Sequence, residues 1–110
     1  MEPSDIPEEV RNELKKTGGT DELIKKIDEK TIEEQSYIYK ALSEPLRLKI
    51  LSLLNQQDLC VCLLKEMLDI ADSKLSYHLS ILKEKNLIQG NRQANFMIYR
   101  ITEKGKRYSL

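Results

Sequence analysis

The chain has 110 residues, of which 40% are hydrophobic and 33% charged, and its 18 acidic and 18 basic side chains give a formal net charge of zero. This length allows a single modest core, built mainly from Leu and Ile because the sequence has one Phe and no Trp. It shows neither an apolar run of membrane-spanning length nor a signal peptide's basic-then-apolar layout, so we expect a cytoplasmic protein with no membrane partner.

Charge is distributed unevenly along the chain. Residues 1–35 carry a net charge of −5, residues 36–72 of −1, and residues 73–110 of +6, with only two carboxylates in that last segment. A basic segment predicts a polyanionic partner, because phosphate neutralisation supplies most non-specific affinity for nucleic acid. The neutral total argues against a strong, indiscriminate binder.

The first 30 residues are predicted to form two short helices. Ser4 or Asp5 would cap the first helix, Gly18-Gly19 would stop it, and the second would run over residues 20–30. We expect this N-terminal extension, residues 1–30, to pack against a second copy of the chain, with a frayed acidic arm as the alternative. The apolar side chains available for this contact are Ile6, Val10, Leu14, Leu23, Ile24 and Ile27.

Residues 31–110 are predicted to form one domain. Thr31 opens a helix with a capping box over residues 31–34, and Ser43 caps the next helix, over residues 46–55. A short helix over residues 63–68, a turn over residues 69–72 and a second helix then make a helix-turn-helix.

The second helix of this motif has two different faces. Leu75, Leu79 and Leu82 recur at helical spacing and form an apolar stripe, and Asn86 follows as a left-handed cap. Ser73 is the expected N-cap. The opposite face has no carboxylate and suits either solvent or the phosphates and base edges of DNA. That face consists of Ser73, Ser76, Tyr77 and Ser80.

After Ile88 the chain predicts a two-stranded β-hairpin. Residues 89–95 are polar and rich in turn formers, and residues 96–101 are β-prone. The hairpin has a basic tip and would form a wing beside the helix-turn-helix. The expected fold is therefore mainly α with a small β-hairpin.

These segments resemble the ArsR/SmtB family of winged helix-turn-helix repressors. The resemblance rests on IYKALSEPLRLKIL at residues 38–51, LCVC at 59–62, SKLSYHLSILKEKNLI at 73–88 and MIYRI at 97–101, in the family's order and spacing. It implies a homodimeric repressor that binds double-stranded operator DNA and leaves it on binding a metal or metalloid. It also implies that Lys74 flanks the reading face and that Arg92 and Asn95, near the wing tip, contact phosphate or the minor groove. His78 lies beside the leucine stripe and is expected to be a half-buried, hydrogen-bonding support.

Cys60 and Cys62 are the candidate inducer site that the resemblance implies. Their thiolates are soft ligands suited to As(III), Cd(II), Zn(II) or Cu(I). In a regular helix two such residues point about 200° apart, so both can hold one ion only if the backbone is non-helical there. A disulfide between such near neighbours would be strained and close almost no loop, so we do not expect one. Lys65 stands where arsenic sensors often carry a third cysteine.

Three other interpretations remain open at this point. The cysteines can respond to thiol oxidation, or they can be buried small residues with no sensing role. The winged helix can instead mediate protein–protein contact. An enzyme is not expected, because the sequence shows no Ser/His/Asp order, phosphate loop or HExxH element.

Overall fold

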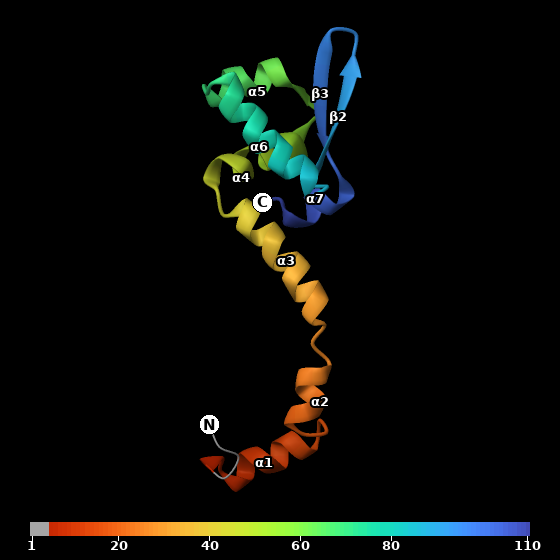
Figure 1. Cartoon of the computed structure of the whole chain (residues 1–110). Helices are drawn as coiled ribbons and strands as arrows, with labels where there is room; N and C mark the ends of the chain where they lie inside the picture. Colours follow the sequence, from red (N-terminus) through yellow and green to blue (C-terminus); the bar gives the residue numbers. More distant parts are fainter. Residues whose placement is uncertain (1–4) are drawn as a thin grey trace. The chain divides into compact units, whose positions relative to one another are not determined.

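The computed structural model describes residues 5–110. They form α1 (Glu8–Lys15), α2 (Thr20–Lys25), α3 (Glu29–Leu42), α4 (Pro45–Gln56), β1 (Leu59–Cys60), α5 (Val61–Leu68), α6 (Asp72–Glu84), β2 (Ile88–Gln93), β3 (Phe96–Ile101) and α7 (Glu103–Tyr108) (Figure 1). The chain groups into an N-terminal unit that ends at Ser36 and a C-terminal unit over Tyr37–Leu110. Within residues 5–110 no helix is both long and apolar enough to cross a lipid bilayer.

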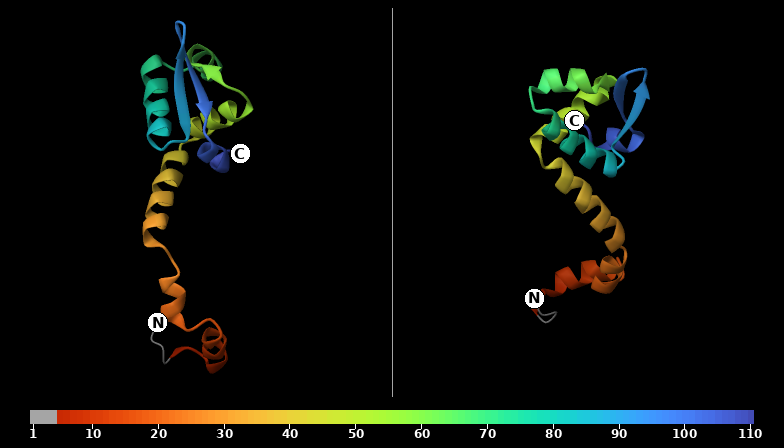
Figure 2. Two further views of the ribbon diagram at one scale, coloured as in Figure 1. Left: turned by 90° about the vertical axis from the view of Figure 1, so that its right-hand side faces the viewer. Right: turned by 45° about the horizontal axis from the view of Figure 1, so that its top comes forward.

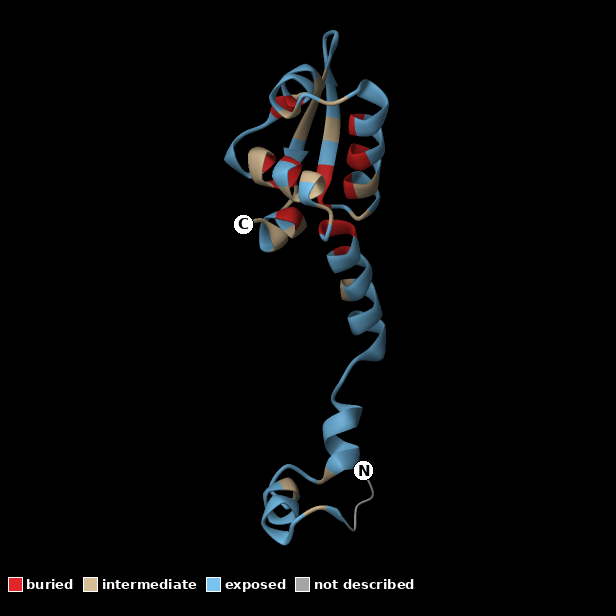
Figure 3. Cartoon of the chain, turned by 90° about the vertical axis from the view of Figure 1, so that its left-hand side faces the viewer, coloured by how far each residue is buried: buried red, intermediate tan, exposed pale blue. Residues whose placement is uncertain are grey.

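The described part of the N-terminal unit, residues 5–36, contains no buried side chain. No side chain is buried in α1 or α2, both of which the structure describes in full (Figure 3). Pro7 is the N-cap of α1 and no side chain caps that helix, so the predicted Asp5 cap is wrong, and Ser4 lies outside the described residues. The predicted glycine stop is confirmed: both glycines have positive φ, and the Gly19 amide donates to the Leu14 carbonyl at 2.9 Å.

Helix α3 begins earlier than expected because an aspartate caps it. The Asp28 carboxylate accepts from the amides of Lys30 and Thr31, and the Thr31 hydroxyl donates to it at 2.7 Å. These bonds, with the Thr31 hydroxyl first, lower the pKa of Asp28. The predicted capping box at Thr31 is therefore wrong, because an acceptor three residues upstream already satisfies the free amides.

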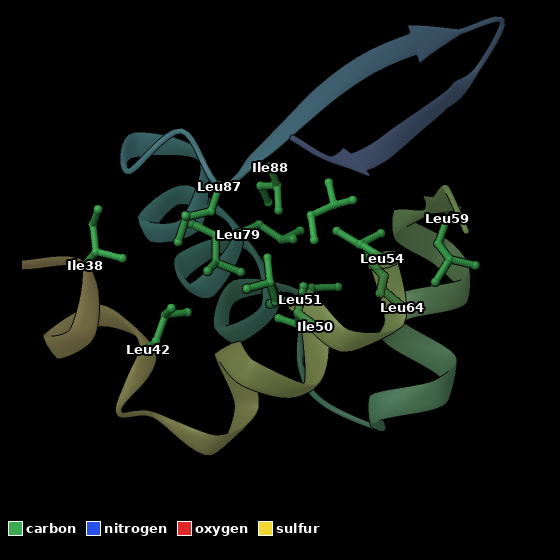
Figure 4. Packing of buried hydrophobic residues seen from close by; sticks show 13 residues of the cluster. Ile38, Leu42, Ile50, Leu51, Leu54, Leu59, Leu64, Leu79, Leu87 and Ile88 are labelled. Carbon is green, nitrogen blue, oxygen red and sulfur yellow. The ribbon is translucent and has the colours of Figure 1, made fainter. Parts of the chain in front are cut away.

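Leucine and isoleucine from every large element of the C-terminal unit form its core. Side chains of α3, α4, α5 and α6 converge with those at the start of β2 (Figure 4). Glu44, rather than the predicted Ser43, caps α4 by accepting from the Leu46 amide at 3.3 Å. The core members that are almost fully buried are Ile50, Leu51, Leu54, Leu64, Leu75, Leu82, Leu87 and Ile88.

The sheet has three antiparallel strands in the order β1-β3-β2. The predicted hairpin is confirmed, with Ile88 opposite Ile101 and Gln93 opposite Phe96. A third strand was not predicted: the two-residue β1 pairs with β3, so that Cys60 lies opposite Ile98. The fold is thus mainly helical with a small sheet, and the helix-turn-helix with its wing is confirmed.

Helix α7 is fixed against the turn that follows α6. The Thr102 hydroxyl donates to the Asn86 carbonyl at 2.6 Å and accepts from the Gly105 amide at 3.0 Å. Asn86 has φ +61°, which confirms the predicted left-handed cap. Gly105 is required here because a Cβ at this position would collide with the Leu87 carbonyl.

Candidate DNA-binding surface and cysteine pair

Helix α6 directs its leucine stripe into the core. Leu75, Leu79 and Leu82 are at most 3% exposed, as the helical spacing predicted. The helix begins at Asp72 with Ala71 as its N-cap and no side-chain cap, so the predicted Ser73 cap is wrong. Asp69 in the left-handed conformation ends α5 and turns the chain, which places Ser73 inside the first turn of α6.

The opposite face of α6 is exposed and carries no carboxylate from Ser73 to Ser80, and Glu84 lies at its C-terminal end. Tyr77 is 60% exposed, and the Ser80 hydroxyl donates to the Tyr77 carbonyl at 2.7 Å, so Ser80 presents mainly acceptor lone pairs. At the N-terminal end of α6, Asp72 is paired with Lys65 of α5 at 2.9 Å. The predicted helix residues are thus all exposed on α6, four on this face and Lys74 at its flank. These are Ser73, Lys74, Ser76, Tyr77 and Ser80.

The wing supplies the other two predicted contact residues. Helix α6 and strand β2 lie side by side (Figure 2). Arg92 is exposed near the end of β2, and Asn95 is exposed in the turn before β3. Phe96 beside this turn is 57% exposed, which the sequence analysis did not single out. The role of Arg92 and Asn95 as DNA contacts stays a prediction.

His78 is hydrogen-bonded, as expected, but it is buried, at 5% exposure, rather than half-buried, and its supporting role stays a prediction. Its Nδ1 lies 3.1 Å from Nη1 of Arg47 in α4. Burial, reinforced by the Arg47 charge, lowers the pKa of His78. The sequence analysis missed Arg47, whose only sequence signal is a cation in the first turn of the helix that packs on α6.

Cys60 and Cys62 are joined by a disulfide bond, so the expectation that they would stay unbridged is wrong. Cys60 is extended and is the N-cap of α5, whereas Cys62 lies in the first turn of that helix. Because Cys60 lies before the helix, its side chain is not held about 200° away from that of Cys62, and the two sulfurs can meet across a Cα–Cα distance of 5.4 Å, which is within the normal range for a disulfide. The Cys60 sulfur also accepts from the Leu63 amide at 3.4 Å.

The chemistry of a metal site here depends on reduction of that bond. Within residues 5–110 no group of three or more His, Cys, Asp or Glu side chains is placed to hold a metal ion. Lys65, at the position of the expected third ligand, is instead paired with Asp72. The reduced pair would thus offer two thiolates, and other ligands to a thiophilic ion would come from solution.

Comparison with known proteins identifies the family. Residues 44–89 match the bacterial regulatory protein, arsR family. Over 83 residues the chain is 36% identical to the arsenical resistance operon repressor of Bacillus subtilis (strain 168), covering 74% of this chain and 71% of that protein.

Two solved structures share the fold. The first is reduced HlyU from Vibrio cholerae N16961, with a TM-score of 0.68, 28% identity and coverage of 73% of this chain and 85% of that chain. The second is the homodimeric winged helix-turn-helix DNA-binding domain of Mb0332 from Mycobacterium bovis, with a TM-score of 0.65, 28% identity and coverage of 71% and 73%. The chain therefore belongs to the arsR family and is a DNA-binding transcriptional repressor of the ArsR/SmtB type, a family of regulators and not of enzymes.

Proposed function

We propose that this repressor acts in the cytoplasm as a homodimer that reads operator DNA with α6 and leaves it when Cys60 and Cys62 react. The observation that carries the proposal is the exposed face of α6. From Ser73 to Ser80 it is free of carboxylates, it lies opposite the buried leucine stripe, and it belongs to the segment with a net charge of +6. The homodimeric state of the related Mb0332 domain supports the proposed assembly.

The residues of this surface suit different parts of a DNA duplex. A helix fits the major groove, where Ser hydroxyls and the Tyr77 ring can meet base edges, and Lys74 at the flank can meet a phosphate. Arg92 and Asn95 on the wing can meet phosphates or the minor groove. Base contacts would supply sequence preference and phosphate contacts would fix the register.

Release is proposed to begin at the reduced cysteine pair. A thiophilic ion such as As(III), Cd(II), Zn(II) or Cu(I) that binds both thiolates would withdraw the Cys60 sulfur from the Leu63 amide. Helix α5 would lose its cap and shift at the end nearest β1, while its other end leads directly into α6. The Bacillus subtilis relative's name, an arsenical resistance operon repressor, supports a metalloid as the inducer.

A second candidate is favoured by the disulfide itself. Disulfides in cytoplasmic proteins are usually transient and redox-sensing, so oxidation of Cys60 and Cys62 would be a signal in its own right. Cys62 is exposed, which gives an oxidant access to the pair. Oxidation ties Cys60, the N-cap residue of α5, to Cys62 in the first turn of that helix, and it needs no third ligand.

One titration tests both routes. Wild-type protein is reduced, bound to a labelled duplex that it has selected from a random pool, and titrated with arsenite, Cd(II), Zn(II), Cu(I) or the thiol oxidant diamide. Release by the ions alone supports metal sensing, and release by diamide alone supports redox sensing. If none of these reagents releases the protein, the proposed sensing is wrong. If no sequence is selected at all, the proposed DNA reading is wrong.

We also propose that the N-terminal unit contributes to the homodimer. Its apolar side chains find no core within the unit: Val10 is 49% exposed and Ile24 59% exposed. Leu23 and Ile27 are also exposed, whereas Ile6 and Leu14 are half-buried and line a hollow beside the end of α1. Covering such side chains with a second copy would remove apolar surface from water.

Deletion of residues 1–27 tests this contribution. The cut keeps Asp28, so α3 retains the carboxylate that caps it. We expect the dimer dissociation constant, measured by sedimentation equilibrium, to rise by about 100-fold, because roughly 3 kcal/mol of apolar burial is lost. The matched control is the full chain with Leu23→Ser and Ile24→Ser, whose dimer dissociation constant should also rise. A truncated protein that stays a tight dimer contradicts the proposal.

A further inference from the structure

We propose that Arg47 and His78 form a clamp between helices that orients α6, and that operator binding requires the imidazole of His78 to be neutral. The two are positioning residues, since neither belongs to the exposed face that would meet DNA. The inference rests on the proposed function of α6 as the reading helix. It goes beyond that function by assigning a residue pair that controls the helix.

Arg47 ties three helices together. It lies in the first turn of α4, its Nε donates to the Ala41 carbonyl, and its Nη1 lies 3.1 Å from His78 Nδ1. Ala41 belongs to the last turn of α3, where carbonyls lack partners within the helix and favour a cation. One guanidinium therefore fixes the end of α3, the start of α4 and the middle of α6.

The partner of Arg47 determines the state of the imidazole. A guanidinium is always charged and only donates, so His78 Nδ1 must accept and the ring must be neutral with its proton on Nε2. The His78 ring in turn meets the Tyr77 ring edge-to-face, with centroids 5.3 Å apart. Rotation of the imidazole would therefore move the largest exposed side chain of the reading face.

The surrounding charges work against protonation of His78. Arg47 faces it from α4, Glu44 from the N-cap of the same helix, and Lys74 from its own helix. Burial is the largest effect and lowers the His78 pKa; Arg47 and Lys74 also lower it, whereas Glu44 raises it. A proton added in acid would remove the acceptor and place two cations in contact.

The sign of the resulting pH dependence is diagnostic. Because the folded pKa lies below the unfolded one, unfolded chains take up the proton first, and stability falls as pH drops below the usual histidine range. Operator affinity is expected to fall with it. Simple electrostatics predicts the opposite, since added positive charge strengthens attraction to DNA. His78 is the only histidine of the sequence, so the transition can be assigned to one side chain.

The experiment compares wild-type protein with His78→Asn, His78→Leu and Arg47→Lys on one duplex, selected from a random pool by the wild-type protein near pH 7.5. Asparagine places an amide oxygen close to the position of Nδ1 and does not titrate, so this variant keeps the acceptor. Leucine removes the acceptor, and lysine cannot reach both partners. Affinity is measured by fluorescence anisotropy between about pH 7.5 and about pH 5.5, with circular dichroism recorded on each sample.

We expect wild-type affinity to fall towards about pH 5.5, by less than about tenfold because the His78 pKa lies below its usual value, while the affinity of His78→Asn stays flat. Both His78→Leu and Arg47→Lys should bind about tenfold more weakly near neutral pH. Long-range ¹H–¹⁵N spectra of the free protein should show the Nε2–H tautomer at neutral pH. A flat or rising wild-type profile, or wild-type affinity in His78→Leu, overturns the clamp while leaving DNA reading intact. Failure to select any duplex overturns the proposed function, and the clamp's role with it.

Discussion

Replacing Ser76 and Tyr77 together by alanine is expected to remove most of the preference for operator over random DNA. Both side chains lie on the exposed face of α6, and Tyr77 is its largest member, 60% exposed. Each good base contact contributes about 1–3 kcal/mol of discrimination, so loss of two should reduce the ratio of specific to non-specific affinity by roughly 100-fold. The measurement is that ratio, from anisotropy titrations on the selected and a scrambled duplex.

The fold of this double variant should be unaffected, because exposed substitutions usually change stability by less than about 0.5 kcal/mol. The matched control is Arg92→Ala on the wing. If Arg92 contacts phosphate, its loss weakens binding to both duplexes equally. The slope of log affinity against log salt concentration should then become shallower by about one. Unchanged discrimination in the Ser76 and Tyr77 variant would count against α6 as the reading helix.

Replacing Cys60 and Cys62 together by serine is expected to leave DNA binding intact and to abolish release. Serine is a good N-cap, so its hydroxyl can replace the Cys60 sulfur as acceptor for the Leu63 amide, and α5 should keep its position. The variant has neither thiolates for a soft ion nor sulfurs for a disulfide. In the release titration its bound fraction should not change at reagent concentrations that free all of the wild-type protein.

The single variants separate the two sensing routes. Cys62→Ser cannot form the internal disulfide but keeps one thiolate. Diamide should therefore not release this variant from DNA, whereas a soft ion should release it only at concentrations about 100-fold higher than for the wild-type protein. Cys60→Ser should behave in the same way. Release of the double variant by the same reagents would show that the signal enters elsewhere in the chain.

The elements that depend on local pattern could be predicted, and those that depend on distant pairing could not. The spacing of Leu75, Leu79 and Leu82 determined which face of α6 is buried, and Asn86 marked its end correctly. Strand β1 was not predicted, because its two residues are extended only where they pair with Tyr99 and Ile98, which lie far along the chain.

The same distinction holds within the candidate site. The exposed serines and Tyr77 follow from helical period alone, whereas the Arg47–His78 contact joins residues 31 positions apart and leaves no periodic signal. Cap positions failed for another reason: Asp28, three residues before Thr31, supplies the acceptor for α3, and Glu44 supplies it for α4 although the preceding Ser43 is the more favoured N-cap type.

The pairing of Cys60 with Ile98 has a kinetic consequence. Cys60 caps α5, which leads to the reading helix, and it also belongs to the sheet that carries the wing. Ion binding or oxidation at this one residue would therefore disturb the proposed base contacts and the proposed phosphate contacts in a single step. The charge of residues 73–110, which guides encounter with DNA, is unchanged by that event. The inducer would thus shorten the residence time on the operator and leave the association rate nearly constant.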